Sequence, residues 1–308
     1  MSNKEIKEIF ETGLFMGRIK FDEPMSAHTS LKIGGPVEIM IFPEDVVSLK
    51  NVLLVAKMQK IPVFVLGAGT NLLVRDKGLE GIAVSLKSFK KIEVIQDDTE
   101  KNVSLFVEAG VPLKSIINFT KEKGYSGMEA LSGIPGSLGG AVCMNAGSFG
   151  TEIKDMLSSI AVIGMDGMIT MLNRDEIKFS YRSSNLPDDL IILSANIALK
   201  KDTPDNVSRR IREFLKKKVL TQPLKERSAG CVFKNPAEDS AGRLIDAAGC
   251  KGMRIGDVEV SMLHANYFIN RGRALSKDFI ELMEAVKIKV KEYSGITLEP
   301  EIKIIGRE

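Results

Sequence analysis

Glycine and other small residues are concentrated in one segment of this 308-residue chain, and that segment restricts the possible folds most. Residues 133–150 read GIPGSLGGAVCMNAGSFG and contain six glycines, while their polar residues are few and small. An ordinary surface loop would carry more Asp, Lys and Asn. The pattern therefore favours backbone wrapped closely around a flat or phosphorylated ligand over the alternative, a buried glycine-rich crossover.

Another glycine loop, Gly67-Ala68-Gly69-Thr70-Asn71, follows an apolar run at residues 61–66. In chain order it is the first glycine loop, and residues 133–147 form the second. Backbone N–H groups in such a turn can point at a phosphate, and the missing side chains let a ligand approach closely. Leu72 stands where a dinucleotide-binding fingerprint has its third glycine, and no Gly-Lys-Ser/Thr follows as in a P-loop. Taken alone, this loop favours a tight turn between strands.

Composition and charge narrow the class of protein. Apolar residues make up 44% and charged residues 27%, as in ordinary globular proteins, and 43 basic against 40 acidic side chains leave only +3. This balance indicates neither nucleic acid nor a membrane surface as a partner, and the apolar runs are too short for a membrane span. The charged N-terminal sequence has no apolar signal core. We therefore expect a cytoplasmic protein. As a separate expectation, which these features do not decide, we take it to be a monomer or weak dimer.

The cysteines and histidines give no metal pattern. Three cysteines, Cys143, Cys231 and Cys250, cannot form a complete disulfide framework, so we expect reduced thiols. The two histidines, His28 and His264, belong to no cluster with metal-ligand spacing. The sequence predicts neither a structural nor a catalytic zinc.

Helix and strand patterns predict a mixed α+β fold, because they do not alternate strictly enough for a doubly wound parallel sheet. Apolar periodicity and capping residues predict helices at residues 45–60, 112–124, 203–218 and 276–293, and a short helix capped by Ser240. Strands are predicted at residues 61–66, 82–86, 91–95, 103–108, 191–199 and 301–305, and on either side of His264. Asp166-Gly167 predicts a hairpin with a tight primed turn. Gln222-Pro223 is typical of a domain boundary.

Several motifs together resemble a known family. Residues 29–36 (TSLKIGGP), 67–74 (GAGTNLLV) and 133–147 (GIPGSLGGAVCMNAG) resemble the FAD domain shared with the vanillyl-alcohol oxidase group. The motifs YRSS, AGCVFKNP, GRLID and LEPEIK, at residues 181–184, 229–236, 242–246 and 298–303, narrow the resemblance to the UDP-N-acetylenolpyruvoylglucosamine reductase family. The ordered match covers about residues 20–306. Because only 48 residues separate Arg182 from Cys231, the chain resembles the branch that lacks an extra substrate-clamping loop.

The resemblance implies a two-lobed FAD-binding domain of the vanillyl-alcohol oxidase (PCMH) type and a smaller α+β substrate-binding domain. The expected lobes are residues 1–90 and 91–218, followed by the substrate domain at 219–298 and a C-terminal strand, 299–308, that returns to the active site. The residues expected to bind FAD non-covalently are Gly67, Ala68, Gly69, Thr70, Asn71, Leu72, Gly133, Ile134, Pro135, Gly136, Ser137, Gly139, Gly140, Asn145, Ala146 and Gly147.

The reaction implied by the resemblance has two halves, and the cofactor carries the difficult chemistry. NADPH, the expected co-substrate, gives hydride to FAD. Flavin N5 then delivers hydride to the terminal carbon of UDP-N-acetylglucosamine enolpyruvate, charge builds on the neighbouring carbon and its carboxylate, and a protein acid protonates that carbon. The expected product is UDP-N-acetylmuramate, a peptidoglycan precursor.

Three residues match the catalytic positions of the family. Arg182 matches its arginine, whose guanidinium can fork onto a carboxylate and stabilise developing charge. Glu301 matches its glutamate, able to share charge or a proton if burial raises its pKa. On a regular strand Glu299 would point the same way, so alternation does not distinguish the two glutamates, and only the family register selects Glu301. Without the resemblance, Arg182 reads as a surface arginine and Glu301 as an edge-strand carboxylate.

Cys231 stands where the family most often has a serine as proton donor. A thiol titrates near pH ~8.5, so it is mostly protonated at neutral pH and gives up a proton more readily than an alcohol. If Arg182 or Lys225 lowered the thiol pKa, the acid would be lost. The alternative role is a small buried hydrophobe, which is the role expected for Cys143 and Cys250.

Four further residues match substrate positions. Asn235 matches a family contact to the nucleotide sugar, and Lys225 and His264 stand at positions of polar substrate contacts. His264 is equally explained as a structural histidine that caps a strand. Tyr181 is expected either to line the flavin–substrate pocket or to pack in the core.

Two rival functions stay open on sequence grounds. One is a different FAD oxidoreductase on the same domain, with flavin attached covalently through His28 or Cys143. The other is a nucleotide-binding protein without turnover. The combination of Arg182, Cys231 and Glu301 argues against both.

Overall fold

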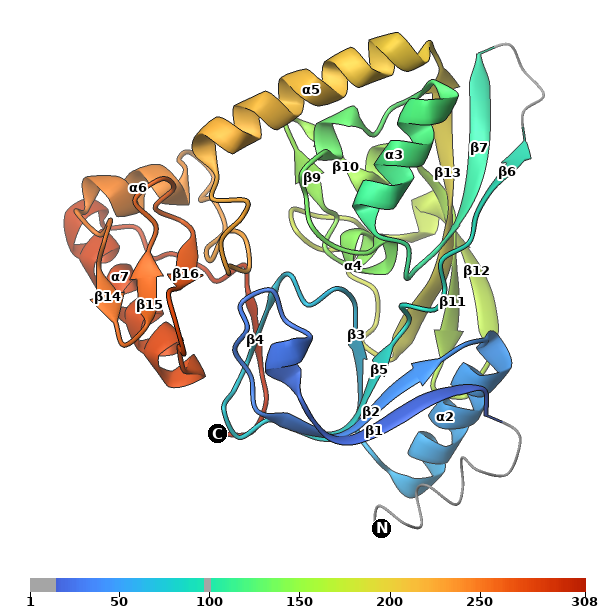
Figure 1. Ribbon diagram of the computed structural model, residues 1–308, viewed down its shortest axis with the longest axis horizontal. Coiled ribbons are helices and arrows are strands. Elements are labelled where there is room, and N and C mark those ends of the chain that lie inside the picture. Colours follow the sequence, from blue (N-terminus) through green and yellow to red (C-terminus); the bar gives the residue numbers. More distant parts are fainter. Residues whose placement is uncertain (1–14, 97–100) are drawn as a thin grey trace. The chain divides into compact units, whose positions relative to one another are not determined.

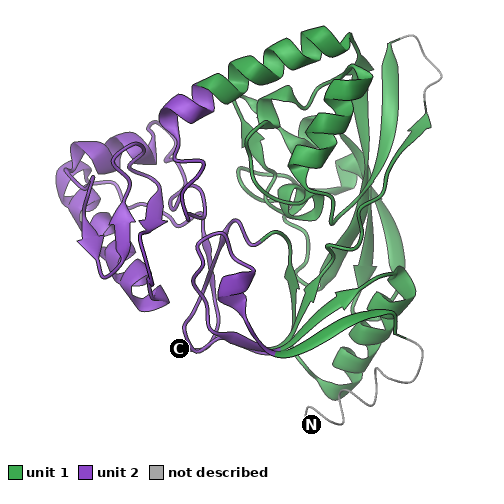
Figure 2. Ribbon diagram, viewed as in Figure 1, with its two compact units in different colours: residues 1–21, 39–68, 81–216 green, residues 22–38, 69–80, 217–308 purple. Residues whose placement is uncertain are grey.

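The computed structural model describes residues 15–96 and 101–308, which form two compact units (Figure 2). Unit 1 comprises Met1–Phe21, Ile39–Ala68 and Gly81–Lys216, and unit 2 comprises Asp22–Glu38, Gly69–Glu80 and Lys217–Glu308. The chain passes between the units several times, so unit 2 contains two short N-terminal segments beside the C-terminal third. The expected division of the FAD-binding domain into lobes stays a prediction.

The larger sheet of unit 1 is antiparallel, with strand order β12-β11-β13-β7-β6 and β8 paired to β13 (Figure 1). Its strands are β6 (Ile92–Gln96), β7 (Asn102–Glu108), β8 (Tyr125–Ser126), β11 (Leu157–Gly164), β12 (Ile169–Asn173) and β13 (Leu190–Lys201). Alternate residues of β7, namely Val103, Leu105 and Val107, are buried. This is the period of two expected of a strand with one face on a core.

A four-stranded sheet has the order β1-β2-β5-β3, with β3 and β5 parallel. Its strands are β1 (Gly17–Pro24), β2 (Pro36–Pro43), β3 (Val63–Leu66) and β5 (Leu79–Ser85). Helix α2 (Val46–Gln59) begins after Asp45, whose carboxylate accepts a hydrogen bond from Ser48 N–H at 2.7 Å. Its buried side, which includes Leu49 and Leu53, joins the core of unit 1.

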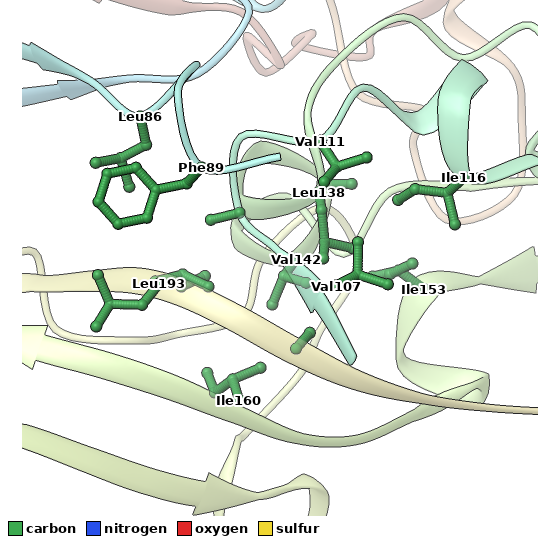
Figure 3. Close-up of a cluster of buried hydrophobic side chains, with 14 of the residues drawn as sticks. Leu86, Phe89, Val107, Val111, Ile116, Leu138, Val142, Ile153, Ile160 and Leu193 are labelled. Atoms are coloured by element: carbon green, nitrogen blue, oxygen red, sulfur yellow. The ribbon is translucent and has the colours of Figure 1, made fainter. Parts of the chain in front are cut away.

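The core of unit 1 lies between the large sheet and two helices, α3 (Leu113–Lys123) and α4 (Leu138–Cys143). Figure 3 shows Val107 and Leu193 from the sheet near Leu138 and Val142 of α4. Helix α4 packs against β7 and β13. The remaining short elements are η2 (Glu129–Leu131), β9 (Gly147–Ser148), β10 (Thr151–Glu152), η3 (Ile153–Asp155) and η4 (Arg174–Glu176). The core thus supports the segment that leads into α4, which is the second glycine loop.

Unit 2 packs two helices and a small antiparallel sheet around its own core. Its elements are η1 (Met25–Ala27), β4 (Leu72–Val74), α6 (Ala241–Ala247), β14 (Arg254–Ile255), β15 (Val258–Val260), β16 (Phe268–Asn270), α7 (Ser276–Ser294) and β17 (Lys303–Ile305). Helix α7 buries Phe279, Leu282, Met283, Val286 and Val290. Strand β17 pairs in parallel with β4, so the C-terminal segment returns to the end of the first glycine loop.

Helix α5 (Pro204–Thr221) carries a buried cation, Lys218, whose residue is 1% exposed. Burial lowers the pKa of Lys218 to about 8 from an ordinary value of 10.5. Between these two values the unfolded chain binds more protons than the folded chain, so the free energy of unfolding rises with pH from about 8 to 10.5.

We expect Lys218→Met to remove this rise and to increase the free energy of unfolding at pH 7 by ~1–3 kcal/mol. Urea unfolding at a series of pH values measures both effects. Lys216→Met, at an exposed position of the same helix, is the control and should keep the slope. A Lys218→Met protein with the slope of the original chain would contradict the assignment.

The structure confirms the predicted α+β class and the main helices and strands, and it corrects three details. The hairpin at Asp166-Gly167 forms, but its connection has four residues, 165–168, and not a tight two-residue turn. The reason is local: the Asp166 carboxylate accepts from Met168 N–H at 2.9 Å, which stabilises the longer turn. The last strand begins at Lys303 and not at residue 301.

The third correction concerns Cys143, which is exposed and not a buried small hydrophobe. It ends the short helix α4, on the side of the chain away from Leu138 and Val142, which face the core. Cys250 is buried as expected, and burial raises the pKa of its thiol.

Across residues 15–96 and 101–308, no helix is long and apolar enough to span a membrane. The same part of the chain contains no group of three or more His, Cys, Asp and Glu residues suited to a metal ion.

Candidate active site

The two glycine loops approach each other within unit 1. A Cβ atom placed on Gly67 would lie 3.1 Å from Ser137 Oγ and 3.9 Å from Gly140 Cα. Gly67 follows β3, and Ser137 and Gly140 lie at the start of α4, so residues far apart in the sequence form one surface of backbone and small side chains. A glycine at position 67 allows this close approach.

The second loop is fixed by backbone hydrogen bonds to residues 109–113. Leu138 N–H donates to Val111 O, Gly139 N–H donates to Ala109 O, and Leu113 N–H donates to Gly136 O, each at 2.9 Å. Gly136 has a φ of +143°, a conformation that other residues rarely adopt. The loop is therefore held in one shape before any ligand binds.

The first loop continues into unit 2, where Asn71 connects it to the C-terminal segment. Asn71 Nδ2 donates to Glu301 O at 3.1 Å, and Lys303 N–H donates to Asn71 O at 3.1 Å. Gly69 has a φ of +65°, and a Cβ atom there would lie 2.1 Å from His28 O. Only glycine fits at position 69, and Asn71 supports the backbone of Glu301.

Cys231 and Glu301 occupy adjacent backbone positions in unit 2. Glu301 N–H donates to Val232 O at 2.8 Å, and isolated bridges join Cys231 to Tyr267 and Phe233 to Pro300. Cys231 is partly exposed. The structure thus joins the two segments that carry Cys231 and Glu301, which are widely separated in the sequence.

The structure also separates the two glutamates that alternation does not distinguish. Glu299 is exposed, and its carboxylate lies 3.6 Å from Lys234 Nζ. Glu301 is partly buried, next to the residue that follows Cys231. Residues 299–302 do not form a regular strand, so the two side chains have different surroundings.

Asn266 was not predicted, although it holds the segment of Cys231 in place. Its side chain is buried, donates to Phe233 O at 2.7 Å and accepts from Phe233 N–H at 2.9 Å. Its backbone carbonyl accepts from Val232 N–H at 2.9 Å. A buried amide must have its hydrogen bonds satisfied. The only sequence signal was an asparagine within an otherwise apolar stretch, which does not reveal a partner.

Arg182 lies in unit 1, in a turn of residues 180–185 that we name the Arg182 turn. Ser180 and Ser183 exchange backbone hydrogen bonds of 2.9 and 3.2 Å. Arg182 has a φ of +58° and Asn185 a φ of +50°, which are uncommon values for residues other than glycine. Strained conformations of this kind persist where surrounding contacts fix them, and they are frequent in functional sites.

Tyr181 does not pack in the core, because 44% of its surface is exposed. The Arg182 guanidinium lies over its ring, with Cζ 4.9 Å from the ring centroid. This cation–π contact limits the directions that Arg182 can take.

The other predicted substrate residues lie in unit 2. Lys225 is exposed, and Asn235 Oδ1 accepts from Ala241 N–H at 3.0 Å, at the start of α6. His264 Nδ1 accepts from Asn266 N–H at 3.3 Å, and the imidazole packs edge-on against Tyr267. Burial lowers the pKa of His264, which favours the neutral ring. These contacts favour a structural role for His264, and its contact with the substrate stays a prediction.

Comparison with known proteins assigns two segments of the chain to described families. Residues 37–173 match a family described as FAD binding domain, and residues 222–305 match the C-terminal domain of UDP-N-acetylenolpyruvoylglucosamine reductase. A protein named UDP-N-acetylenolpyruvoylglucosamine reductase from Syntrophomonas wolfei is 41% identical, with 94% of this chain and 96% of that protein covered. One of the same name from Caldanaerobacter subterraneus is 39% identical, with 99% and 98% covered.

The chain belongs to the UDP-N-acetylenolpyruvoylglucosamine reductase family.

A solved structure agrees with this assignment. The crystal structure of UDP-N-acetylenolpyruvylglucosamine reductase (MurB) from Thermus caldophilus superposes with a TM-score of 0.80, at 34% identity, over 94% of this chain and 99% of that one. The resemblance expected from the motifs is confirmed, as are the class of enzyme, an oxidoreductase, and FAD as its cofactor. Gly67, Ser137 and Gly140 are small residues that lie close together. Such a surface fits a cofactor that is held mainly by backbone groups.

Proposed function

We propose that this protein reduces UDP-N-acetylglucosamine enolpyruvate to UDP-N-acetylmuramate at the expense of NADPH, as a step in peptidoglycan precursor synthesis. The observation that carries the proposal is the hydrogen bond from Glu301 N–H to Val232 O, next to Cys231, in a chain that matches the reductase family over 94% of its length. When bound, FAD would supply the hydride chemistry that links NADPH to the enolpyruvyl sugar. The two glycine loops, residues 67–72 and 133–147, hold this cofactor.

Three side chains act on the substrate. Arg182 binds the enolpyruvyl carboxylate through two parallel N–H donors and stabilises the negative charge that develops there. The Cys231 thiol donates the proton that completes the reduction at the carbon next to that carboxylate. Glu301 shares charge or a proton with the same part of the substrate. Without a donor at position 231, charge would build up with no route to product.

Unit 2 also supplies contacts to the nucleotide sugar. Asn235 lies at the end of the segment that carries Cys231, and His264 contacts Tyr267, which forms a bridge with Cys231. Lys225 is exposed, and its long side chain would supply a positive charge to an anionic group of the ligand. Tyr181, beside Arg182, contributes an exposed ring to the substrate side of unit 1.

Absorption spectra test the proposed function. We expect a yellow protein that bleaches with NADPH under anaerobic conditions and recovers its colour when UDP-N-acetylglucosamine enolpyruvate is added. UDP-N-acetylglucosamine, which lacks the double bond, is the control and should leave the protein bleached. A protein that NADPH does not bleach, or that the enolpyruvyl sugar does not recolour, would refute the proposal. Denaturation should release free FAD, whereas flavin that stays attached would favour an oxidase with covalent flavin.

A further inference from the structure

We propose that Asn145 and Glu152 are positioning residues that hold the Arg182 turn in its reactive conformation. This inference rests on the proposed function, because it assigns Arg182 to the enolpyruvyl carboxylate. Asn145 was expected to contact the cofactor, and no sequence motif pointed to Glu152. The contacts of both side chains within unit 1 indicate that they support the Arg182 turn.

Asn145 is a buried link between the second glycine loop and the Arg182 turn. Its side chain is fully buried, and Nδ2 donates to Ser180 O at 3.1 Å and to Glu152 Oε2 at 2.9 Å. Its Oδ1 accepts from Lys154 N–H at 3.4 Å. Both donor hydrogens and the carbonyl oxygen of the amide therefore have protein partners, and the side chain serves the protein scaffold.

Glu152 places a negative charge next to the Arg182 turn. Burial by itself would raise the pKa of this carboxyl group, but hydrogen bonds from Lys154 and Asn145 and the positive charges of Lys154 and Arg182 lower it overall. Glu152 is thus ionised at neutral pH and attracts the Arg182 guanidinium. It also forms an ion pair with Lys154 and caps the short helix η3.

A third contact joins the same two segments through backbone alone. Ser184 N–H donates to Cys143 O at 3.0 Å, at the end of α4. Two hydrogen bonds therefore hold the turn near its ends, one from Asn145 Nδ2 to Ser180 O and one from Ser184 N–H to Cys143 O. Between them, Arg182 adopts a φ of +58°. The glycine loop that contacts the cofactor and the arginine that contacts the substrate therefore share one support.

The consequence for catalysis is geometric. A displacement of about 1 Å in a group that orients a substrate can cost about a hundredfold in rate. Loss of the Glu152 charge would remove one of the attractions that orient the guanidinium, beside its contact with the Tyr181 ring. The step that uses Arg182 should then suffer, and the step that only loads the cofactor should not.

The test is Glu152→Gln, which keeps the size of the side chain and a hydrogen-bond acceptor for Asn145 but removes the charge. In stopped-flow measurements we expect bleaching of the flavin by NADPH within about twofold of the original rate, and recovery by the enolpyruvyl sugar slower by about 10- to 100-fold. Combined with Arg182→Lys, the loss should be smaller than the product of the two single losses, because both changes affect one interaction. Glu176→Gln, which removes a similar helix-capping carboxylate from η4, is the control and should change neither step.

Hydrogen exchange provides a readout that does not depend on turnover. In Glu152→Gln the amides of residues 180–185 should exchange at least several-fold faster, while those of Glu176→Gln should not. Equal slowing of both half-reactions, strictly multiplicative losses in the double variant, or unchanged exchange in the turn would overturn the inference. If the original protein is not recoloured by the sugar, the proposed function fails, and the exchange measurement still decides whether Glu152 holds the turn.

Discussion

Cys231→Ala should still oxidise NADPH, but its reduction of the enolpyruvyl sugar should be slower by ~10²–10⁴-fold. Loading of the cofactor needs no proton from position 231, whereas completion of the sugar product does. Alanine keeps the small volume of the residue but supplies no proton. The negative charge that develops on the substrate during hydride transfer is then not neutralised from position 231. The two half-reactions, followed separately by stopped-flow absorbance, should therefore differ sharply in their response.

Two further variants make this prediction specific. Cys231→Ser restores an O–H donor and should recover most of the sugar-reducing rate. Cys250→Ala removes the buried thiol of unit 2 and should leave both half-reactions near the original rates. Full turnover by Cys231→Ala would contradict the assignment of the proton donor, and equal loss in Cys250→Ala would point to a general effect on the fold of unit 2.

Arg182→Ala should reduce the rate of sugar reduction by ~10²–10³-fold, the loss typical when one preorganised donor to a developing negative charge is removed. Arg182→Lys should recover only part of it, because an ammonium group keeps the charge but not the planar pair of donors. The difference should appear mainly in kcat for the sugar, since the charge being stabilised grows toward the transition state.

Steady-state kinetics with the enolpyruvyl sugar and with NADPH varied in turn measure these effects. Arg209→Lys, at an exposed position on α5, is the matched control and should be neutral. A change in KM for the sugar with kcat unchanged would mean that Arg182 only binds the ground state. Unchanged kinetics in Arg182→Ala would remove it from the site.

Local sequence signals predicted most elements because the forces that form them are local. Asp45 and Lys60 bound α2 at the expected residues, and the apolar side of α7 is the buried side. Prediction failed at Asp166-Gly167, where a side-chain hydrogen bond to Met168 favours a longer turn than the dipeptide alone suggests. Preferences of a few residues are weak enough for one such contact to change the outcome.

The candidate site was predicted in part. The ordered motifs assigned Cys231, Glu301 and Arg182 by resemblance, and the structure pairs the backbone of Glu301 with that of Val232, the residue after Cys231. They did not reveal Asn266, nor the part that we propose for Glu152. The side chain of Asn145 is buried among protein partners, and the expected contact of this residue with FAD stays a prediction. The role of a buried polar residue depends on its hydrogen-bond partners, and those partners lie elsewhere in the chain.

The sequence by itself determined the α+β class, the positions of the main helices and strands, and the family. The spacing of apolar residues, the capping residues and the glycine content act over a few residues, so they can be recognised in the sequence alone. Only the tertiary structure decided that Glu301 pairs with Val232 and Glu299 with Lys234, that Cys143 is exposed, and that Asn145 joins the second glycine loop to the Arg182 turn. These outcomes depend on burial and hydrogen bonds between distant residues, and no short stretch of sequence contains both partners.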